Sequence, residues 1–350
     1  MTSELRELIY QGSVKNVWRV TQGLIFSYTD QYSLFDWGVM PDLIPQKGVS
    51  LAMMHRNLYS WLAQQGITVG LVTDPLFWPQ SLLSHEVLVE EFDKFHCAFD
   101  EQAGKWVYRS AQSKNYLLPL EVVFRFRVHG QSSFVERWNH QTKTNIKHGD
   151  MLPNVVIEFF SKLEDQDRFL CEEEVKAILG CGDDFIDHIR FTAIRIAELL
   201  RSAWEPLGFE LWDGKFEFGF KADQRQLVLV DAIGLDEVRL TFDQIPFSKE
   251  VLRDLYRRTS WYHEVVEKKR QALDNPHLMG NWKNNVTQKP PRLPQPWIDW
   301  VSRMYQIMGL LEYDMLPMQQ SKIRPQLDQL KRDYQNLIGL EWKEFSSGKN

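Results

Sequence analysis

The stretch 213–239, DGKFEFGFKADQRQLVLVDAIGLDEVR, constrains the fold of this chain more than any other. Apolar residues alternate with other residues on both sides of the polar segment 221–226, which is the pattern of two strands joined by a turn. A turn centred on Gln224 places Glu217 directly opposite Asp231, because each lies seven residues from the centre. The sequence therefore predicts an antiparallel hairpin with two facing carboxylates.

Two carboxylates that face each other across a strand pair repel, which costs a sheet roughly 0.2–1 kcal/mol. A cation between them removes this cost, and Mg²⁺ in phosphate-transferring sites is held by a few carboxylates together with phosphate oxygens and water. Glu217 and Asp231 are thus candidate metal ligands, and Lys215 and Arg239 would supply positive charge for an anion beside the metal. A second interpretation stays open: an ordinary solvent-facing strand pair whose register is shifted by one residue.

Size and composition indicate one large or two ordinary globular domains. The chain has 350 residues, of which 43% are hydrophobic and 25% charged. The formal net charge of −6 argues against a nucleic-acid binder. The sequence has neither the apolar run of roughly 18 residues that a membrane span needs nor the apolar core of a secretory signal. With three cysteines that show no metal-ligand spacing, we expect a cytoplasmic protein with free thiols and no membrane partner.

The order of the predicted elements indicates an α+β fold. The predicted strands outside the hairpin are 8–10, 14–20, 24–28, 84–92 and 117–128. The predicted helices are 50–65, 184–204, 297–311 and 324–340. The segment 271–296 is rich in Pro and Asn and lacks periodicity, so we expect a long functional or mobile loop there.

We expect these elements to form three parts. Residues 1–116 would form a β-rich N-terminal lobe, and residues 117–270 an α+β catalytic lobe that contains the hairpin. Residues 271–350 would add the irregular loop and the C-terminal helices. An active site is expected in a cleft between the two lobes.

Three further patterns point to anion binding. Arg125 and Arg127 share one face of the strand 117–128, and two such guanidinium groups need an anionic partner, either an acidic side chain or a ligand. Gly12 followed by Lys15 is typical of a turn whose backbone approaches phosphates, although this spacing is also common by chance. The segment 28–48 sets polar residues among Phe, Tyr, Trp and Pro, which is typical of a loop that lines a pocket.

Short blocks of the sequence, in this order, resemble the phosphoribosylaminoimidazole-succinocarboxamide synthase (SAICAR synthetase) family. They are Gly-x-x-Lys at 12–15, TDQYSLFD with IPQKG, PLEVVFRFRVHGQS, IEFFSKLEDQD, DGKFEFGF with LVDAIGLDEVRL, and PPRLPQPWIDWVSRMYQIMGLL. The blocks cover roughly residues 8–311. The resemblance implies a two-lobe fold with antiparallel sheets, an ATP cleft between the lobes and a helical C-terminal extension.

The resemblance also implies a reaction. Members of the family are ATP-dependent ligases of purine biosynthesis that use Mg²⁺. They join the amine of L-aspartate to the carboxylate of 5-amino-1-(5-phospho-D-ribosyl)imidazole-4-carboxylate, giving SAICAR, ADP and phosphate. A carboxylate is a poor electrophile, so it is first activated as an acyl phosphate, and this phosphoryl transfer needs Mg²⁺ and fixed positive charge.

The site residues that the resemblance implies fall into four groups. The metal ligands would be Glu217 and Asp231. The ATP contacts would be Gly12, Ser13, Lys15, Leu118 and Glu121. The ribonucleotide and aspartate contacts would be Arg125, Ser132, Ser133, Asp167, Asp236 and Arg239. The catalytic residues would be Lys215, Asp213 and Asp36. For Arg125 a structural ion pair is the alternative.

The chain departs from the family pattern in segments that contact substrate. Ser13 stands where the family often has a lysine, Ala232 and Gly234 alter the block after the hairpin, and the acidic loop 162–168 is one residue shorter and lacks a proline. These departures motivate two alternatives to the ligase. One is a divergent paralogue that ligates another amine or carboxylate, and the other is a nucleotide-binding protein that has lost ligation. The expected partners are small-molecule substrates, a ribonucleotide and an amino acid, and a homo-oligomer is compatible with the sequence.

Overall fold

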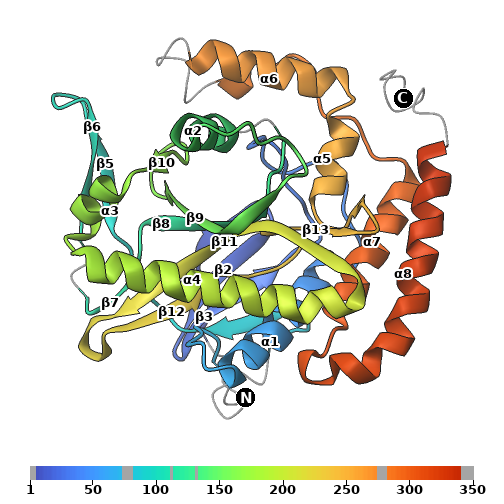
Figure 1. The fold of residues 1–350 in the computed structure, drawn as a ribbon, viewed down its shortest axis with the longest axis horizontal. Helices are drawn as coiled ribbons and strands as arrows, with labels where there is room; N and C mark the ends of the chain where they lie inside the picture. Colours follow the sequence, from blue (N-terminus) through green and yellow to red (C-terminus); the bar gives the residue numbers. More distant parts are fainter. Residues whose placement is uncertain (1–4, 73–81, 111–112, 131–132, 274–281, 340–350) are drawn as a thin grey trace. The chain divides into compact units, whose positions relative to one another are not determined.

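The structure is a computed structural model that describes residues 5–72, 82–110, 113–130, 133–273 and 282–339. It has the predicted α+β class, with antiparallel sheets and helices (Figure 1). The chain divides into two compact units that alternate along the sequence. The first unit comprises Met1–Asn57, Asp74–Val89 and Asp243–Asn350, and the second comprises Leu58–Thr73 and Glu90–Phe242.

The predicted boundaries after residues 116 and 270 do not coincide with these units. Residues 90–116 belong to the second unit, and residues 243–270 belong to the first. The reason is pairing between segments that are distant in sequence. In the first unit, for example, the hydroxyl groups of Tyr32 and Tyr256 lie 2.9 Å apart in a buried contact.

The first unit contains a four-stranded antiparallel sheet in the order β1-β2-β3-β4. Its strands are β1 (Glu7–Gln11), β2 (Lys15–Val20), β3 (Gly23–Tyr28) and β4 (Glu86–Val89). Its other elements are β14 (Ile245–Pro246), α5 (Glu250–Tyr256), α6 (Ser260–Leu273), α7 (Gln295–Gly309), α8 (Leu316–Gly339) and the 3₁₀ turn Tyr313–Met315. The helix α1 (Lys47–Gln64) begins in this unit and ends in the second. The sequence predicted all four strands and placed α1 to within about three residues.

Helix α8 begins earlier than the predicted start at residue 324 and continues through Pro325. The indole Nε1 of Trp300 in α7 donates a hydrogen bond to the carbonyl of Leu330 at 2.8 Å, and the Trp300 and Tyr334 rings lie 5.3 Å apart. Leu327 is also buried. Packing against α7 therefore stabilises a helix that the proline on its own would interrupt.

The second unit is built on a larger antiparallel sheet in the order β10-β9-β8-β11-β13, in which β7 and β12 pair with the far half of β11. Its strands are β7 (Asn115–Leu117), β8 (Leu120–Arg127), β9 (Met151–Ser161), β10 (Phe169–Leu170), β11 (Phe209–Lys221), β12 (Gln226–Val230) and β13 (Val238–Phe242). A separate hairpin consists of β5 (His96–Asp100) and β6 (Lys105–Arg109). The helices are α2 (Ser133–Thr142), α3 (Glu172–Leu179), α4 (Asp183–Trp204) and the 3₁₀ turns Glu205–Leu207 and Ala222–Gln224.

One face of this larger sheet is apolar and packs against α4, which runs along β8, β9 and β11 (Figure 1). The predicted stripe of α4 is buried in full: Ile186, Ile189, Ala193, Ile196 and Leu200. On the sheet, Phe124 and Phe216 stack with ring centroids 4.7 Å apart. Gly214 lies directly opposite Phe124 on the neighbouring strand. A Cβ there would approach the Phe124 ring to 2.7 Å, so the close packing requires glycine. The opposite face of the sheet is free for polar groups.

Two further expectations concern the described residues. Cys97, Cys171 and Cys181 are free thiols, as predicted. In the part of the chain that the structure describes, no helix has the length and apolar character needed to cross a bilayer.

His55 makes the first unit sensitive to acid. It is buried, and the Tyr28 hydroxyl lies 2.8 Å from its Nδ1. Burial, together with the positive charges of Lys15 and Arg56, lowers the pKa of His55 to about 3. Because the pKa of an unfolded histidine is about 6.5, the stability contributed by neutral His55 is complete above that pH and is lost as the pH falls toward 3.

We therefore expect the free energy of unfolding to fall below pH 6.5 by up to about 1.4 kcal/mol per pH unit through His55 alone. Urea unfolding between pH 4.5 and 7.5 measures this slope, and His55→Gln should reduce it. His263→Gln, in an exposed position of α6, is the matched control. Identical pH slopes for the wild type and His55→Gln would contradict the assignment.

Candidate active site

The predicted hairpin is present, but its register differs by one residue from the prediction. Glu217 pairs with Val230, not with Asp231. The cause is the turn: the 3₁₀ segment Ala222–Gln224 and Arg225, which has a left-handed φ of 50°, close the pair Lys221–Gln226. The hairpin centre therefore lies between residues 223 and 224. Direct pairing of the two carboxylates is wrong, although Asp231 directly follows the partner of Glu217.

Asp231 is also the point at which β12 ends. Its φ of 61° is left-handed, which turns the chain out of the strand. The two carboxylates thus lie at the same end of the hairpin, one in a strand and one at the start of the following turn. Their assignment as metal ligands stays a prediction.

The face of the larger sheet opposite α4 carries most of the charged residues that the sequence singled out. Asp213 lies directly opposite Arg125 of β8 and Arg239 of β13, so the three side chains project to the same side. Because side chains alternate between the two faces of a strand, every second residue from these three projects to the same side. We call the following set the charged face: Glu121, Arg125, Glu158, Asp213, Lys215, Glu217 and Arg239.

At one end of the charged face, two lysines alternate with two glutamates. Lys215 Nζ forms an ion pair with Glu121, and Lys162 Nζ forms one with Glu217. Lys162 Nζ also lies 3.6 Å from Glu121 Oε1. Burial alone lowers the pKa of Lys215, but the negative charges of Glu121 and Glu217 outweigh it and raise that pKa above its usual value. Lys215 therefore stays protonated at neutral pH.

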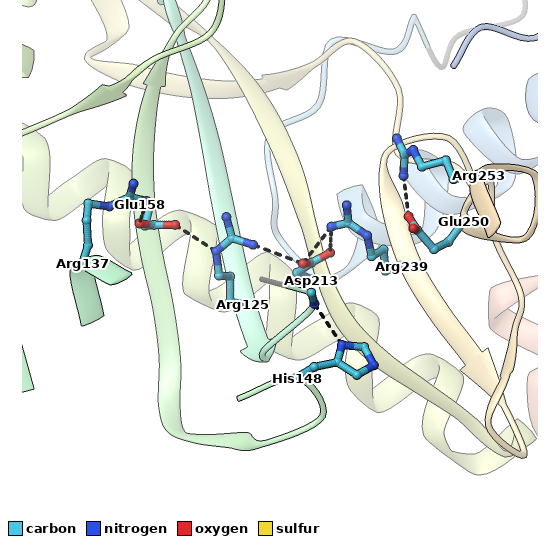
Figure 2. A network of polar contacts seen from close by, with 9 residues as sticks. Arg125, Arg137, His148, Glu158, Asp213, Arg239, Glu250 and Arg253 are labelled. Atoms are coloured by element: carbon cyan, nitrogen blue, oxygen red, sulfur yellow. Dashed lines mark hydrogen bonds and ion pairs between the residues drawn. The ribbon is translucent and has the colours of Figure 1, made fainter. Parts of the chain in front are cut away.

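At the other end, three arginines alternate with two acids (Figure 2). Arg239 Nη1 lies 2.8 and 2.9 Å from the two carboxylate oxygens of Asp213. Arg125 bridges the two acids, with Nη1 3.2 Å from Asp213 Oδ2 and Nε 2.8 Å from Glu158 Oε2. Arg137 Nη2 lies 2.5 Å from Glu158 Oε1. The ion pair that was the alternative interpretation of Arg125 is therefore present, and its contact with a ligand stays a prediction.

In the first unit, the predicted phosphate-binding turn has the expected backbone. Gly12 N–H donates a hydrogen bond to the carbonyl of Lys15 at 3.0 Å, between the end of β1 and the start of β2. A Cβ at Gly12 would lie 2.7 Å from that carbonyl oxygen, so the turn requires glycine. Ser13 lies within the turn, and Lys15 Nζ stands 4.1 Å from the centre of the Phe26 ring.

The other predicted site residues occupy separate positions. Asp36 of the first unit is 87% exposed and pairs with Lys269 at 2.6 Å. Leu118 is buried, and its N–H donates to the carbonyl of Phe218 at 2.8 Å. Ser133 is the first residue of α2, whereas Ser132 lies outside the described residues. Asp167 is exposed in the β9–β10 loop, and Asp236 is half-buried in the turn after β12.

Three residues of this region were not predicted from the sequence: Arg137, Glu158 and Lys162. A signal for Glu158 was available, since a charge inside the apolar run VVIEFF must find a partner when the strand is buried. Arg137 and Lys162 lie in a polar helix and a polar loop, where charge is ordinary. Only the fold brings them to Glu158 and Glu217.

The hairpin carboxylates fit a Mg²⁺ ion that is shared with phosphate groups better than one held by protein alone. Among the described residues, no group of three or more His, Cys, Asp or Glu side chains could enclose a metal. Mg²⁺ in nucleotide sites commonly has only one or two carboxylate ligands, with phosphate and water oxygens completing its shell. Glu217 and Asp231 match that donor set.

Comparison with known proteins identifies the family of this chain. A family model described as SAICAR synthetase matches residues 8–269. A protein of Archaeoglobus fulgidus, provisionally named a phosphoribosylaminoimidazole-succinocarboxamide synthase, is 32% identical over 303 residues, which cover 80% of this chain and 85% of that protein. The synthase of Streptococcus pneumoniae serotype 19F is 29% identical over 272 residues, or 77% of this chain and 99% of that one.

Solved structures show a similar fold. A SAICAR synthase of Saccharomyces cerevisiae in complex with SAICAR has a TM-score of 0.60 at 19% identity, covering 90% of this chain and 96% of that one. A synthase of Ehrlichia chaffeensis has a TM-score of 0.55 at 20% identity over 81% of this chain and all of that one. A SAICAR synthetase in complex with ADP has a TM-score of 0.54 at 21% identity, covering 81% and 99%.

The Asp213 carboxylate supports a stability prediction. Its side chain is 2% exposed and shared by two guanidinium groups, so Asp213→Asn should cost about 3–5 kcal/mol of unfolding free energy. Chemical denaturation measures the loss. Asp328→Asn is the control, because that carboxylate pairs with Arg324 at the surface of α8 and should cost no more than about 1 kcal/mol. Equal losses would show that the network is not a buried one in solution.

Proposed function

The chain belongs to the SAICAR synthetase family, and we propose that its charged face binds and activates the substrates of this ligase. The enzyme forms an amide between the carboxylate of 5-amino-1-(5-phospho-D-ribosyl)imidazole-4-carboxylate and the amine of L-aspartate, and converts ATP to ADP and phosphate. The observation that carries the proposal is the convergence on one sheet face of residues from separate family blocks, Arg125, Asp213, Lys215, Glu217 and Arg239.

We assign the hairpin end of the charged face to the ATP phosphates. Glu217 and Asp231 would hold Mg²⁺, which supplies positive charge to the phosphates when bound. Glu217 is paired with Lys162, so a cation bound to Glu217 would leave the ammonium of Lys162 available to a phosphate oxygen. Lys162 thereby joins Lys215 as fixed positive charge near the transferred group. In the first unit, Gly12, Ser13 and Lys15 form a proposed phosphate-binding turn.

We assign the arginine end of the charged face to the ribonucleotide phosphate. Arg125 and Arg239 offer guanidinium groups, which bind phosphate through charge-assisted hydrogen bonds. Asp213 holds both from its position between them, so their orientation is set before the substrate arrives. Ser133, at the first turn of α2, adds a hydroxyl and the N-terminal end of a ten-residue helix.

Between these two ends, Lys215 is the residue best suited to the reacting carboxylate. Its ammonium stays charged because the pKa is raised by Glu121 and Glu217, so it can stabilise negative charge on the substrate carboxylate and on the oxygen formed when the amine attacks. The amine attacks the carbonyl carbon of the acyl phosphate and forms the C–N bond. The C–O bond to the phosphate then breaks with its electron pair on the phosphate, and the nitrogen loses a proton to water. Asp213 keeps Arg125 and Arg239 in place during these steps. We propose Asp36, Asp167 and Asp236 as further substrate contacts.

Glu217→Gln tests the metal assignment. We expect ADP release to fall by at least about 100-fold, because a neutral amide is a weak ligand for Mg²⁺, while circular dichroism shows an intact fold. The Mg²⁺-dependent part of ADP binding should be lost as well. Glu210→Gln is the control on the same strand, with a side chain that is 54% exposed. Wild-type Mg²⁺ dependence in Glu217→Gln would refute the assignment.

A scan of amine donors tests the substrate. With ATP, Mg²⁺ and the carboxylated ribonucleotide, we expect ADP release with L-aspartate and only background release with other amino acids. Release with a different amine alone would replace the proposal with the divergent paralogue, to which Ala232, Gly234 and the shortened 162–168 loop point. ATP binding without release for any amine would favour the nucleotide-binding protein that has lost ligation.

A further inference from the structure

Helix α2 contacts both members of the ion pair that holds Arg125. The guanidinium of Arg125 lies 4.9 Å from the centre of the Phe134 ring, and Arg137, one turn later, pairs with Glu158. Ser133 and Arg137 are four residues apart and therefore share a face of this helix. One short helix thus carries both a proposed phosphate contact, Ser133, and a residue that pairs with Glu158 of the charged face.

The surroundings of Arg137 direct its charge to Glu158. The guanidinium lies 4.1 Å from the centre of the Phe169 ring and 6.0 Å from that of Phe160. Its Nε is buried and has no hydrogen-bond partner among the described residues. Among the described residues, the ion-pair partner of Arg137 is Glu158, with Nη2 2.5 Å from Oε1. A buried N–H without a partner costs free energy, and such groups are uncommon in native proteins.

Glu158 divides its two oxygens between two arginines. Oε2 accepts a hydrogen bond from Nε of Arg125 at 2.8 Å, and Oε1 accepts one from Nη2 of Arg137 at 2.5 Å. If Arg137 were absent, Oε1 would be available to a second N–H of Arg125. Arginine and carboxylate groups prefer such bidentate pairing. It would engage a second N–H donor of Arg125, which could then no longer bind a ligand.

The charge balance leads to the same conclusion. Arg125, Arg137 and Arg239 carry three positive charges, and Glu158 and Asp213 carry two negative ones, so the network has an excess of one positive charge. Without Arg137 the net charge of the remaining four groups would be zero. A phosphate dianion would then have to break a partly buried ion pair to bind, which is costly at low exposure.

We propose that Arg137 is a positioning residue of the ribonucleotide phosphate site. It neutralises Glu158 from the side away from Arg125, and so keeps the guanidinium of Arg125 available to the phosphate. The identity of the ligand rests on the function proposed above. The arrangement of the three side chains does not.

The test compares Arg137→Gln with the double variant Arg137→Gln/Glu158→Gln. Arg137→Gln should raise the ribonucleotide KM and Kd at least about tenfold, with kcat and the ATP KM within about twofold of wild type. The double variant should recover most of the ribonucleotide affinity, because it also removes the carboxylate that competes for Arg125. Arg137→Lys, which keeps the charge, should lie between Arg137→Gln and wild type.

Arg190→Gln is the matched control. Arg190 lines the same cavity of about 360 Å³ as Arg137, pairs with Glu172 at 2.6 Å and lies 5.8 Å from the Phe159 ring. Because its ion pairs with Glu172 and Asp187 lie outside the charged face, its replacement should leave the ribonucleotide KM unchanged. A general loss of packing around this cavity would affect both variants.

Calorimetric titration of the ribonucleotide without ATP separates this inference from the proposed function. Binding by wild type without turnover overturns the ligase proposal alone, and the Kd ratios then decide the role of Arg137. A wild type that does not bind the ribonucleotide overturns both. Unchanged Kd in Arg137→Gln, equal changes in both substrate KM values, or a double variant weaker than the single one would each show that Arg137 is structural only.

Discussion

The charged face depends on the buried carboxylate of Asp213. Its side chain is 2% exposed, and a carboxylate this buried is stable only when it is paired. The strand order supplies its partners. Because β11 lies between β8 and β13, the residues directly opposite Asp213 on both neighbours project to its side, and both are arginines. One carboxylate thus organises two guanidinium groups that the proposed reaction uses for a phosphate.

The same sheet separates scaffold from chemistry through its two faces. Side chains alternate, so Phe124 and Phe216 face α4 while Arg125, Lys215 and Glu217 face the opposite way. Burial under α4 fixes the strands, and fixed strands hold the charges at defined separations. An active site built on strands is more precisely positioned than one built on loops. Lys162 of the 162–168 loop adds to this face through its ion pair with Glu217.

Each charged group of this face already has a partner within the protein. Glu217 pairs with Lys162, Lys215 with Glu121, and Arg125 with Asp213 and Glu158. Ligands would therefore exchange partners with the protein and not fill an empty charged cavity. Exchange of this kind keeps the unliganded face stable, and it makes affinity depend on residues such as Arg137 that no ligand need touch.

The sequence by itself determined the class of the fold, the strands β1 to β4, the helices α1, α4, α7 and α8, the hairpin, the Gly12 turn and the buried stripe of α4, because alternation, helical periodicity and turn residues are local properties. It also identified Arg125, Asp213, Lys215, Glu217 and Arg239 through family blocks. Tertiary structure alone decided the register of Glu217, which follows from the 3₁₀ turn at 222–224, and the division into two interleaved units. Tertiary structure alone also brought Arg137 to Glu158 and Lys162 to Glu217. The local sequence around a charged residue in a polar segment does not indicate its distant partner.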